Sequence, residues 1–459
     1  MADLRLQKMM AQQHAYFREG QTLPIERRKA QLKRLYEVIV SEKKQIQLAL
    51  KSDLGKSKAE AQNTEISIIL HSIKKTVEHL NKWSRPRKIK TQLIPFFHKS
   101  SILTEPLGTV CIIGPFNYPF QLVFEPLIAA IAAGNTVVVK PSELTPKTAI
   151  CIAAIIEAAF PASQAITILG GKEATTVLLE EKFDLIFFTG SARVGKIVSL
   201  AAAEHLTPVI LELGGKCPAI ILADANIKAA ARKIAWGKFL NCGQTCVAPD
   251  YVFVPKQQKA ELLAELAKAI IHMYGEHPQR SHEYGQIVSI EHTERLAHHI
   301  YKNKDAIYCG GTVDVLAKFI EPTVFDIEST DSELMCEELF GPLLPVIGYT
   351  DIEEVIEYIV SQPKPLACYY FTHNKDAQNN LLTKISSGGV TINHTILHVS
   401  DMALPFGGVG ASGIGAYHGE VGFRAFSHQK SILEHRGPDI IKIIYPKRIS
   451  EIKHPFRKK

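Results

Sequence analysis

The stretch Asp184-Leu-Ile-Phe-Phe-Thr-Gly-Ser-Ala-Arg-Val-Gly-Lys-Ile197 decides the fold of this chain. Its run of four apolar residues, 185–188, predicts a strand that is buried on both faces. Gly190 and Ser191 then form a tight turn that opens a helix, and the free N–H groups of a helix N-terminus favour an anion such as pyrophosphate. An ordinary strand–helix turn, with glycines serving backbone geometry alone, is the alternative that this motif leaves open.

The same turn comes close to two nucleotide-binding motifs and matches neither. Gly190, Gly195 and Lys196 follow the P-loop spacing, but Ile197 stands where Ser or Thr should bind magnesium. The dinucleotide pattern G-x-G-x-x-G fails because Ala192 replaces its second glycine. A P-loop protein is therefore a disfavoured alternative, which magnesium-dependent ATP or GTP hydrolysis would support.

Similar strand-like runs surround this stretch along the chain. They lie at 110–113, 136–139 and 165–169, and helix-like segments separate them at 122–133, 145–159 and 172–180. Strands that alternate with helices predict an α/β fold with a parallel sheet. The alternation restarts over 209–274 and ends in a glycine-rich segment at 404–415, which predicts a second α/β domain, whereas residues 1–83 read as helical.

Length and composition limit the classes of protein that this chain can be. With 459 residues, 46% of them apolar, two or three domains are expected. The net charge of +7 is modest and comes partly from the terminal segment, so nucleic-acid binding is not expected. No apolar stretch reaches the length of a membrane span, although the basic end leaves weak surface attachment open. The eight cysteines show neither a disulfide scaffold nor a complete metal-ligand set, which favours a reducing, cytoplasmic location and no metal site.

Cys246 ends the polar run Asn241-Cys-Gly-Gln-Thr-Cys246, and Glu212 precedes it by 34 residues. An ionised thiol is a strong nucleophile and a nearby carboxylate can act as a base, so the pair predicts covalent cysteine chemistry on a carbonyl. A buried, inert cysteine is the alternative. Asn117, in the stiff loop Gly114-Pro-Phe-Asn-Tyr-Pro119, is an oxyanion-hole candidate, unless it is a turn asparagine bonded to its own backbone.

Two further pairs follow predicted strands or precede turns. Lys140 and Glu143 lie in the run Lys140-Pro-Ser-Glu143, where a donor and an acceptor could contact ribose hydroxyls. Glu338 and Phe340 precede a Gly-Pro turn. Alone, Lys140 and Glu143 are interpreted more simply as a solvated turn, and Glu338 and Phe340 equally well as an exposed carboxylate beside a core phenylalanine.

Taken together, the chain resembles the NAD(P)-dependent aldehyde dehydrogenases, and most closely the class 3 branch with its fatty and aromatic aldehyde dehydrogenases. The matching runs, in order, are GPFNYP (114–119), KPSE (140–143), FTGSARVGK (188–196), LELGGK (211–216), GQTC (243–246), EELFGP (337–342) and LPFGGVG (404–410). The resemblance covers residues 1–437.

The resemblance implies a role for each candidate residue. Cys246 would attack the aldehyde to give a thiohemiacetal and then a thioester, with Asn117 and the backbone N–H of Cys246 holding the oxyanion. Glu212 would activate the water that releases the acid. The cofactor, NAD or NADP, would contact seven residues: Lys140, Glu143, Gly190, Ser191, Gly195, Glu338 and Phe340. The expected substrates are medium- or long-chain aliphatic or aromatic aldehydes.

The resemblance also implies a domain plan. A Rossmann-like cofactor domain would comprise 1–84 and 104–211, and an α/β catalytic domain 212–426. A small β bridging element, 85–103 and 427–437, would join two copies into a homodimer, and 438–459 would form a tail.

Two alternative functions are compatible with the same fold. One is a catalytically silent binding protein, and the other is a coenzyme A-acylating enzyme, in which a thiol replaces water as the acyl acceptor. The presence of Glu212 favours water. Cys242, where relatives often carry Ser, introduces a testable liability to a Cys242–Cys246 disulfide.

Overall fold

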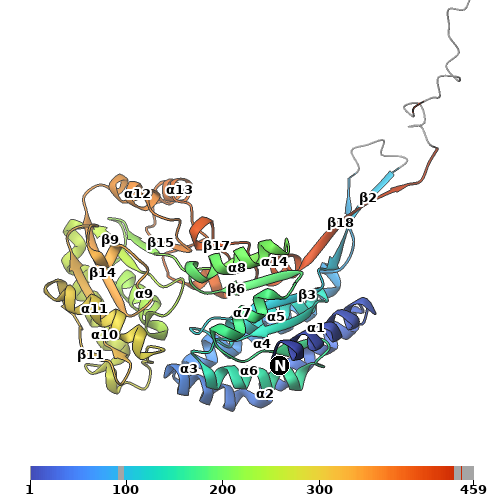
Figure 1. Cartoon of the computed structure of the whole chain (residues 1–459). Helices are drawn as coiled ribbons and strands as arrows, with labels where there is room; N and C mark the ends of the chain where they lie inside the picture. The colour runs from blue at the N-terminus through green and yellow to red at the C-terminus, as the bar shows by residue number, and fades with distance from the viewer. Residues whose placement is uncertain (1, 91–97, 439–445, 447–459) are drawn as a thin grey trace, which may run out of the picture.

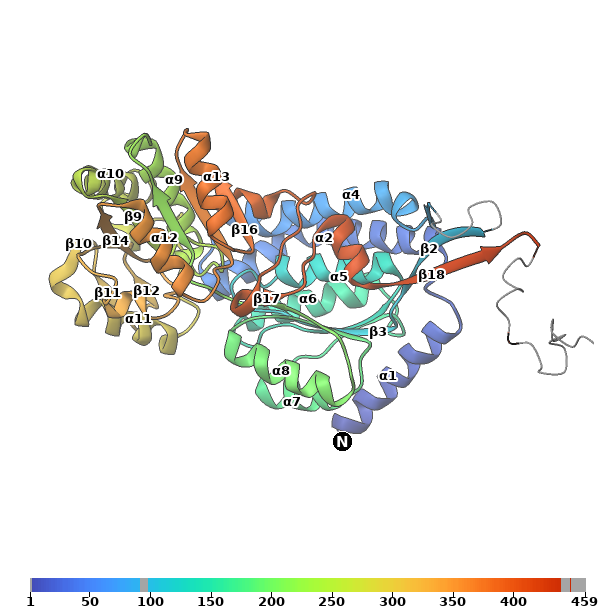
Figure 2. The same ribbon diagram turned by 90° about the horizontal axis from the view of Figure 1, so that it is seen from above.

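The computed structural model describes residues 2–90, 98–438 and 446. Two helix-covered sheets stand side by side, and a narrow third sheet projects from the first of them (Figures 1 and 2). This arrangement confirms the α/β fold class and the restart of the strand–helix alternation that the sequence predicts.

The first sheet has the order β17-β7-β6-β3-β4-β5, and its strands are parallel except for β17, which runs antiparallel to β7. Their bounds are β3 Thr109–Ile113, β4 Thr136–Lys140, β5 Ala165–Thr167, β6 Leu185–Thr189, β7 Val209–Glu212 and β17 Gly413–Ile414. Every residue of β3, β4 and β6 is buried, because helices cover both faces of the sheet.

The helices of the first sheet form two layers (Figure 2). One layer holds α1 Ala2–Arg18, α7 Lys172–Glu180 and α8 Ala192–Glu204. The other holds α2 Ile25–Leu54, α4 Ser67–Trp83, α5 Gln121–Ala133 and α6 Pro146–Ala159. Between α2 and α4, the short α3 Lys58–Ala61 runs directly into a π-helix, η1 Gln62–Ile66. The predicted helical character of the first 83 residues is confirmed over the part that the structure describes.

The second sheet has the order β10-β13-β14-β9-β8-β15-β16 and is parallel except for the edge strand β10. Its strands are β8 Pro218–Ile221, β9 Tyr251–Pro255, β10 Ile307–Cys309, β13 Thr323–Ile327, β14 Leu343–Tyr349, β15 Ala367–Phe371 and β16 Gly389–Ile392. Its helices are α9 Ile227–Phe239, α10 Lys256–Tyr274, α11 Ile290–Lys302, α12 Ile352–Ser361 and α13 Lys375–Lys384. The hairpin β11 Val313–Asp314 with β12 Phe319–Ile320 and the 3-10 turns complete this part: η2 Leu240–Gly243, η3 Pro278–Arg280, η4 Lys304–Ala306, η5 Glu333–Met335, η6 Leu397–Ser400 and η7 Gly410–Ser412.

After the second sheet the chain returns to the first. β17 pairs with β7, and α14 Gly419–Ala425 packs on α4 and α5, although both lie within the range 212–426. The chain then enters the projecting sheet, in which β18 Ser427–His435 pairs with β2 His98–Pro106 over nine residue pairs and β1 Arg87–Ile89 adds the outer strand. The expected tail, 438–459, lies almost wholly outside the described residues.

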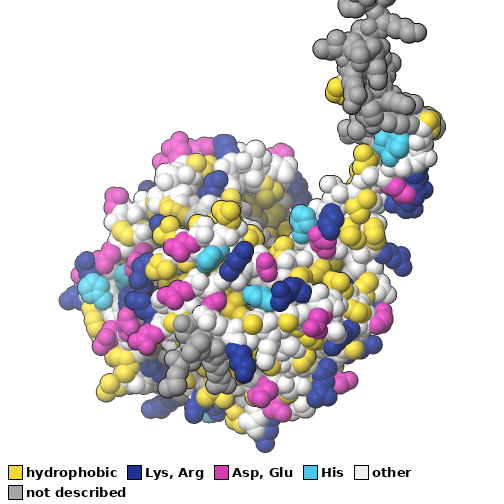
Figure 3. Space-filling model, turned by 45° about the vertical axis from the view of Figure 1, so that its right-hand side comes forward, with side chains coloured by type: hydrophobic (Ala, Val, Ile, Leu, Met, Phe, Trp, Pro, Cys, Tyr) yellow, Lys and Arg dark blue, Asp and Glu magenta, His cyan; other side chains and the backbone are white. Residues whose placement is uncertain are grey.

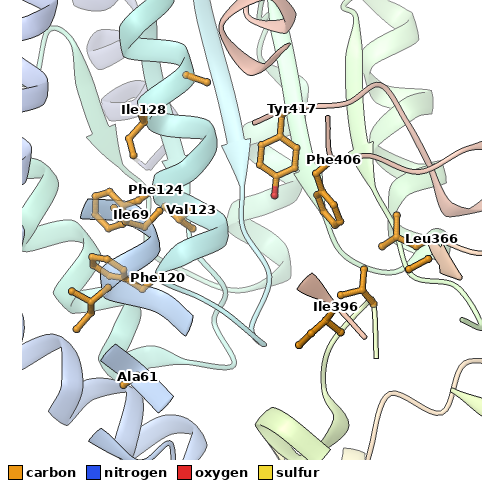
Figure 4. Close-up of a cluster of buried hydrophobic side chains, with 14 of the residues drawn as sticks. Ala61, Ile69, Phe120, Val123, Phe124, Ile128, Leu366, Ile396, Phe406 and Tyr417 are labelled. Atoms are coloured by element: carbon orange, nitrogen blue, oxygen red, sulfur yellow. The ribbon is translucent and has the colours of Figure 1, made fainter. Parts of the chain in front are cut away.

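One hydrophobic cluster runs through both large sheets. It includes nine residues of α5, and every residue of that helix is buried. Figure 4 shows part of it: Ile69, Phe120 and Phe124 gather together, apart from Phe406 and Tyr417 on the other side of the view. On the surface, acidic and basic side chains intermingle over the face shown in Figure 3. In the described part of the chain, none of the helices combines the length and apolar character that crossing a bilayer requires.

Candidate active site

Cys246 follows a turn whose backbone few residues adopt. In η2, after α9, Asn241 and Cys242 have φ +52° and Gly243 has φ +73°. Left-handed backbone favours glycine and tolerates asparagine, and a Cβ at Gly243 would overlap the carbonyl of Gly341. This turn brings Cys246 to the wall of a cavity of about 410 Å³.

The cavity brings together nine of the ten residues predicted to form the site. They are Asn117, Lys140, Glu143, Gly190, Ser191, Glu212, Cys246, Glu338 and Phe340. Several of them follow the carboxyl ends of parallel strands, which meet at one edge of the first sheet. Gly195 does not line the cavity; it lies within α8, where a Cβ would come within 2.7 Å of Leu213 Cδ2, so this glycine allows close helix packing.

Glu212, the last residue of β7, is buried. Neither of its carboxyl oxygens has a hydrogen-bond partner among the described residues. Burial therefore raises the pKa of Glu212 well above its usual value of 4.5. The group is neutral over a wider pH range than an exposed carboxyl, and it is a stronger base once it ionises.

The thiol of Cys246 is also held in its neutral form. Burial raises its pKa, and the neighbouring carboxyl groups of Glu338 and Glu212 raise it further when they are ionised. At neutral pH the free site therefore holds a thiol and not a thiolate. Its activation needs a base or a positive charge beside the sulfur.

Asn117 lies in the loop between β3 and α5 and is 3% exposed. Its backbone carbonyl accepts hydrogen bonds from Lys56 Nζ at 3.0 Å and from Asn241 Nδ2 at 2.8 Å. Gly114 begins the loop, and a Cβ there would overlap Val123 of α5. Both features hold the loop close to the protein interior, with its asparagine at the cavity wall.

The turn after β6 forms a cradle for an anion. A Cβ on Gly190 would lie 2.6 Å from Phe188 Cζ, so only glycine fits against this ring. Ser191 caps α8, and its Oγ accepts from the backbone N–H of Val194 at 3.4 Å. The unpaired N–H groups of the first helical turn and the helix dipole favour negative charge at this point.

Lys140 and Glu143 form a second polar wall. The Lys140 side chain is almost fully buried, and its Nζ donates to Glu143 Oε2 at 2.9 Å and to the carbonyl of Pro141 at 3.0 Å. The Glu143 side chain is 46% exposed, so its carboxylate can move while the lysine stays in place.

A network of charges behind the cavity holds the loop that carries Glu338 and Phe340. Lys216 Nζ donates to the carbonyls of residues 334 and 337 and to Asp250 Oδ2, each at 2.7–2.9 Å. Asp250 also pairs with the fully buried Lys238 at 3.4 Å. Burial, with the charge of Asp250, raises the pKa of Glu338 to about 8.

The sequence-based interpretation missed several residues of this site. Apolar side chains complete the cavity: Phe116, Leu122, Phe406 and Tyr417. Phe406 could have been found, since it lies in the run 404–410. Asp250 and Lys56 act through contacts distant in sequence, and no spacing marks them.

Comparisons with known proteins found relatives over most of the chain. The model of the aldehyde dehydrogenase family matches residues 3–432. A 4,4'-diaponeurosporen-aldehyde dehydrogenase of Staphylococcus aureus is 48% identical over 91% of this chain and 91% of its own length. Aldehyde dehydrogenase family 3 member A2 of Rattus norvegicus is 40% identical over 94% of this chain and 89% of its own.

Solved structures give the same result. The substrate-bound state of Staphylococcus aureus AldH has a TM-score of 0.92 and 46% identity, covering 94% of each chain. An aldehyde dehydrogenase of Mycobacterium tuberculosis complexed with NAD+ has a TM-score of 0.85 at 28% identity, covering 93% of this chain and 89% of its own. A glyceraldehyde-3-phosphate dehydrogenase of Methanocaldococcus jannaschii complexed with NADP has a TM-score of 0.86 at 26% identity, covering 95% of each chain.

Proposed function

The chain belongs to the aldehyde dehydrogenase family, oxidoreductases that oxidise aldehydes with NAD or NADP, and we propose that Cys246, Glu212 and Asn117 perform this reaction here. One observation carries the proposal: a thiol, an unpaired carboxyl group and a loop amide meet in a single cavity with apolar walls. Neither a P-loop nucleotide-binding protein nor a catalytically silent binding protein would require these three groups in one cavity.

In the proposed reaction, Cys246 Sγ bonds to the aldehyde carbon, and the thiol proton leaves to a base. The carbonyl oxygen becomes an oxyanion, which the side-chain amide of Asn117 and the backbone N–H of Cys246 stabilise by donating hydrogen bonds. Loss of one such donor typically costs about 2.7–4 kcal/mol of transition-state stabilisation. A nicotinamide cofactor, when bound, would supply the hydride acceptor. The carbon–hydrogen bond of the former aldehyde then breaks, its hydrogen leaves with both electrons as hydride, and the carbonyl re-forms as the Cys246 thioester.

Glu212 completes the turnover. Once ionised, its carboxylate takes a proton from water, and the resulting hydroxide attacks the thioester carbon. The carbon–sulfur bond breaks, the acid leaves and the Cys246 thiol is restored. A raised pKa supports this role, because a base whose pKa lies closer to neutrality removes protons more effectively. The presence of Glu212 as a base in the cavity also supports water over coenzyme A as the acyl acceptor.

The residues around the cavity fit a dinucleotide cofactor. Gly190 and Ser191 would hold its pyrophosphate at the start of α8, and a side chain at Gly190 would displace this turn by colliding with the Phe188 ring. Lys140 and Glu143 would bind one ribose. Glu338 and Phe340 would bind the other, while Gly195 acts indirectly by letting α8 pack closely. Residues 1–84 and 104–211 would thus form the cofactor domain and 212–426 the catalytic domain, with β17 and α14 returning to the first sheet.

Single-turnover kinetics test the proposed roles. Cys246→Ser is expected to abolish NAD(P)H production from aldehydes. Glu212→Gln is expected to give a burst of reduced cofactor, of about one equivalent per site, followed by slow turnover. Substantial dehydrogenase activity in the serine variant would overturn the nucleophile assignment. A glutamine variant with neither a burst nor a steady-state loss would remove Glu212 from deacylation.

The substrates we propose are medium- or long-chain aliphatic and aromatic aldehydes. Apolar and aromatic side chains line much of the cavity that contains Cys246, among them Phe116, Leu122, Phe406 and Tyr417. Each buried methylene contributes about 0.8 kcal/mol, so kcat/KM should rise with chain length and fall in Phe406→Ala. A flat dependence on chain length would exclude an apolar substrate site.

We further propose that two copies associate through the projecting sheet and that the enzyme works in the cytoplasm. The exposed apolar side chains of Ile89, Ile432 and Leu433 support the first point, because a partner would cover them. The free state of all eight cysteines supports the second. Sedimentation of wild type against Leu433→Lys tests the dimer, and fractionation of cells tests the location.

A further inference from the structure

We propose that the buried ion pair of Lys56 and Glu65 is a positioning device for catalysis, which holds Asn117 and the Cys246 loop in register for oxyanion binding. The inference rests on the proposed oxyanion role of Asn117. Neither residue lines the cavity about Cys246, so both act through the backbone that they hold.

Glu65 lies in the π-helix η1, and its side chain is fully buried. One carboxylate oxygen, Oε2, accepts from the backbone N–H groups of Phe120 at 3.0 Å and Gln121 at 2.9 Å. These groups begin α5, whose N-cap residue makes no capping bond with its own side chain. A carboxylate at a helix N-terminus also complements the helix dipole. Glu65 therefore fixes the carboxyl end of the Asn117 loop.

Lys56 fixes the middle of the same loop. Its fully buried Nζ donates to the second oxygen of Glu65 and, at 3.0 Å, to the carbonyl of Asn117. It also lies 3.9 Å from the ring centroid of Tyr118, within cation–π range. The three donors of the ammonium thus have three acceptors, two oxygens and one aromatic face.

The network then crosses to the nucleophile. Asn241 Nδ2 donates to the carbonyl of Asn117 at 2.8 Å and to that of Gln244 at 3.0 Å. The hydroxyl groups of Tyr118 and Thr245 are 2.7 Å apart. Thr245 precedes Cys246, whose backbone N–H is the other proposed oxyanion donor. The ion pair is therefore connected by hydrogen bonds to both the Asn117 loop and the Cys246 loop, which must both donate to the substrate oxyanion.

A π-helix explains how Glu65 reaches this position. The wider π turn occurs mostly as a single turn inside α-helices, often at functional sites. Here η1 joins α3 to α4 and rotates the following residues relative to an ideal helix. Figure 4 shows Ala61, just before this turn, near Phe120 at the start of α5. The segment 57–66 therefore packs beneath the loop that it holds.

The test is a double-mutant cycle on the acylation step. Lys56→Met keeps the length of the side chain and removes its charge, and Lys58→Met, an exposed neighbour, is the matched control. Rapid-mixing measurement of the NAD(P)H burst with octanal reports acylation, and quenching of protein fluorescence by NAD(P)H reports cofactor binding. A displacement of about 1 Å in a catalytic group typically lowers the rate about 100-fold.

We expect Lys56→Met to slow the burst 10- to 100-fold in the wild-type background and less than 3-fold in an Asn117→Ala background, with cofactor affinity unchanged. An equal loss in both backgrounds, or no loss, would overturn the positioning role. If Lys56→Met does not fold, Lys56→Met/Glu65→Gln removes both charges; failure of both to fold would make the pair purely structural and would also overturn the proposal.

The same cycle separates this inference from the proposed function. Full burst activity in Asn117→Ala alone would remove the oxyanion role itself. A large loss in Asn117→Ala, together with an independent effect of Lys56→Met, would remove only the positioning role.

Discussion

Glu212→Gln should change how the stability of the protein depends on pH, in addition to its effect on turnover. The carboxyl is buried without a hydrogen-bond partner, and its pKa in the folded state is raised well above the unfolded value near 4.5. Between those two pKa values the unfolded chain has released the proton and the native state retains it. The native state therefore binds more protons, and its stability falls as the pH rises.

The size of this effect follows from proton linkage. Inside that window, each pH unit lowers the free energy of unfolding of the wild type by about 1.4 kcal/mol through this one group. Glutamine has no ionisation in this range, so the variant lacks that slope. Its buried amide replaces a neutral carboxyl group that is equally unpaired, so the part of the difference that does not depend on pH should be small. As the pH rises above 4.5, the free energy of unfolding of the variant should therefore increase steadily relative to that of the wild type.

Urea denaturation at intervals between pH 5 and pH 8 measures the difference in free energy of unfolding between the two proteins. Glu180→Gln, at an exposed position, is the control, and its difference from the wild type should stay constant. If the difference for Glu212→Gln is equally constant over this range, Glu212 is already ionised in the folded protein and the argument from burial fails.

Three further changes test other parts of the site. Gly243→Ala should lower activity about 100-fold, because its Cβ would overlap a neighbouring carbonyl at φ +73°; Gly171→Ala, with no atom within 4 Å, should be neutral in the same activity assay. Asp250→Asn should destabilise the protein by about 3–5 kcal/mol, since Lys238 stays buried and unpaired, and should raise KM for the cofactor; unchanged denaturation midpoints would contradict this. Cys242→Ser should leave both activity and the rate of inactivation by peroxide unchanged, because the Cys242 side chain is buried among apolar side chains of the second sheet; slower inactivation of the serine variant would show that a Cys242–Cys246 disulfide forms.

The elements that the sequence predicts well are those with a local signal. The buried run 185–188 lies in β6, and the helix-like segment expected at 122–133 corresponds to α5 Gln121–Ala133. Turn residues such as Gly190 and Ser191 could also be predicted to line the cavity. They follow strands of a parallel sheet, and the carboxyl ends of such strands meet at one edge of the sheet even when the strands are far apart in the sequence.

Features that depend on distant contacts could not be predicted in this way. The Lys56 ammonium meets a carbonyl 61 residues away, at Asn117, and an ion pair of this kind leaves no periodic pattern. The return of β17 to the first sheet could not be predicted either, because a two-residue strand is too short to show a hydrophobic period. Gly195 shows the reverse case, in which a residue within a recognisable motif serves packing instead of the cavity.

The order of the projecting sheet is expected to depend on the protein concentration. Eight of the nine residues of β18 and all three of β1 are exposed, so this sheet has little core of its own. A small sheet without a packed face is marginal in water, and its order must come from whatever covers it. If a second copy provides that cover, mass action governs the arm: dilution should loosen it before the two large cores unfold, and melting should become two-step and concentration-dependent.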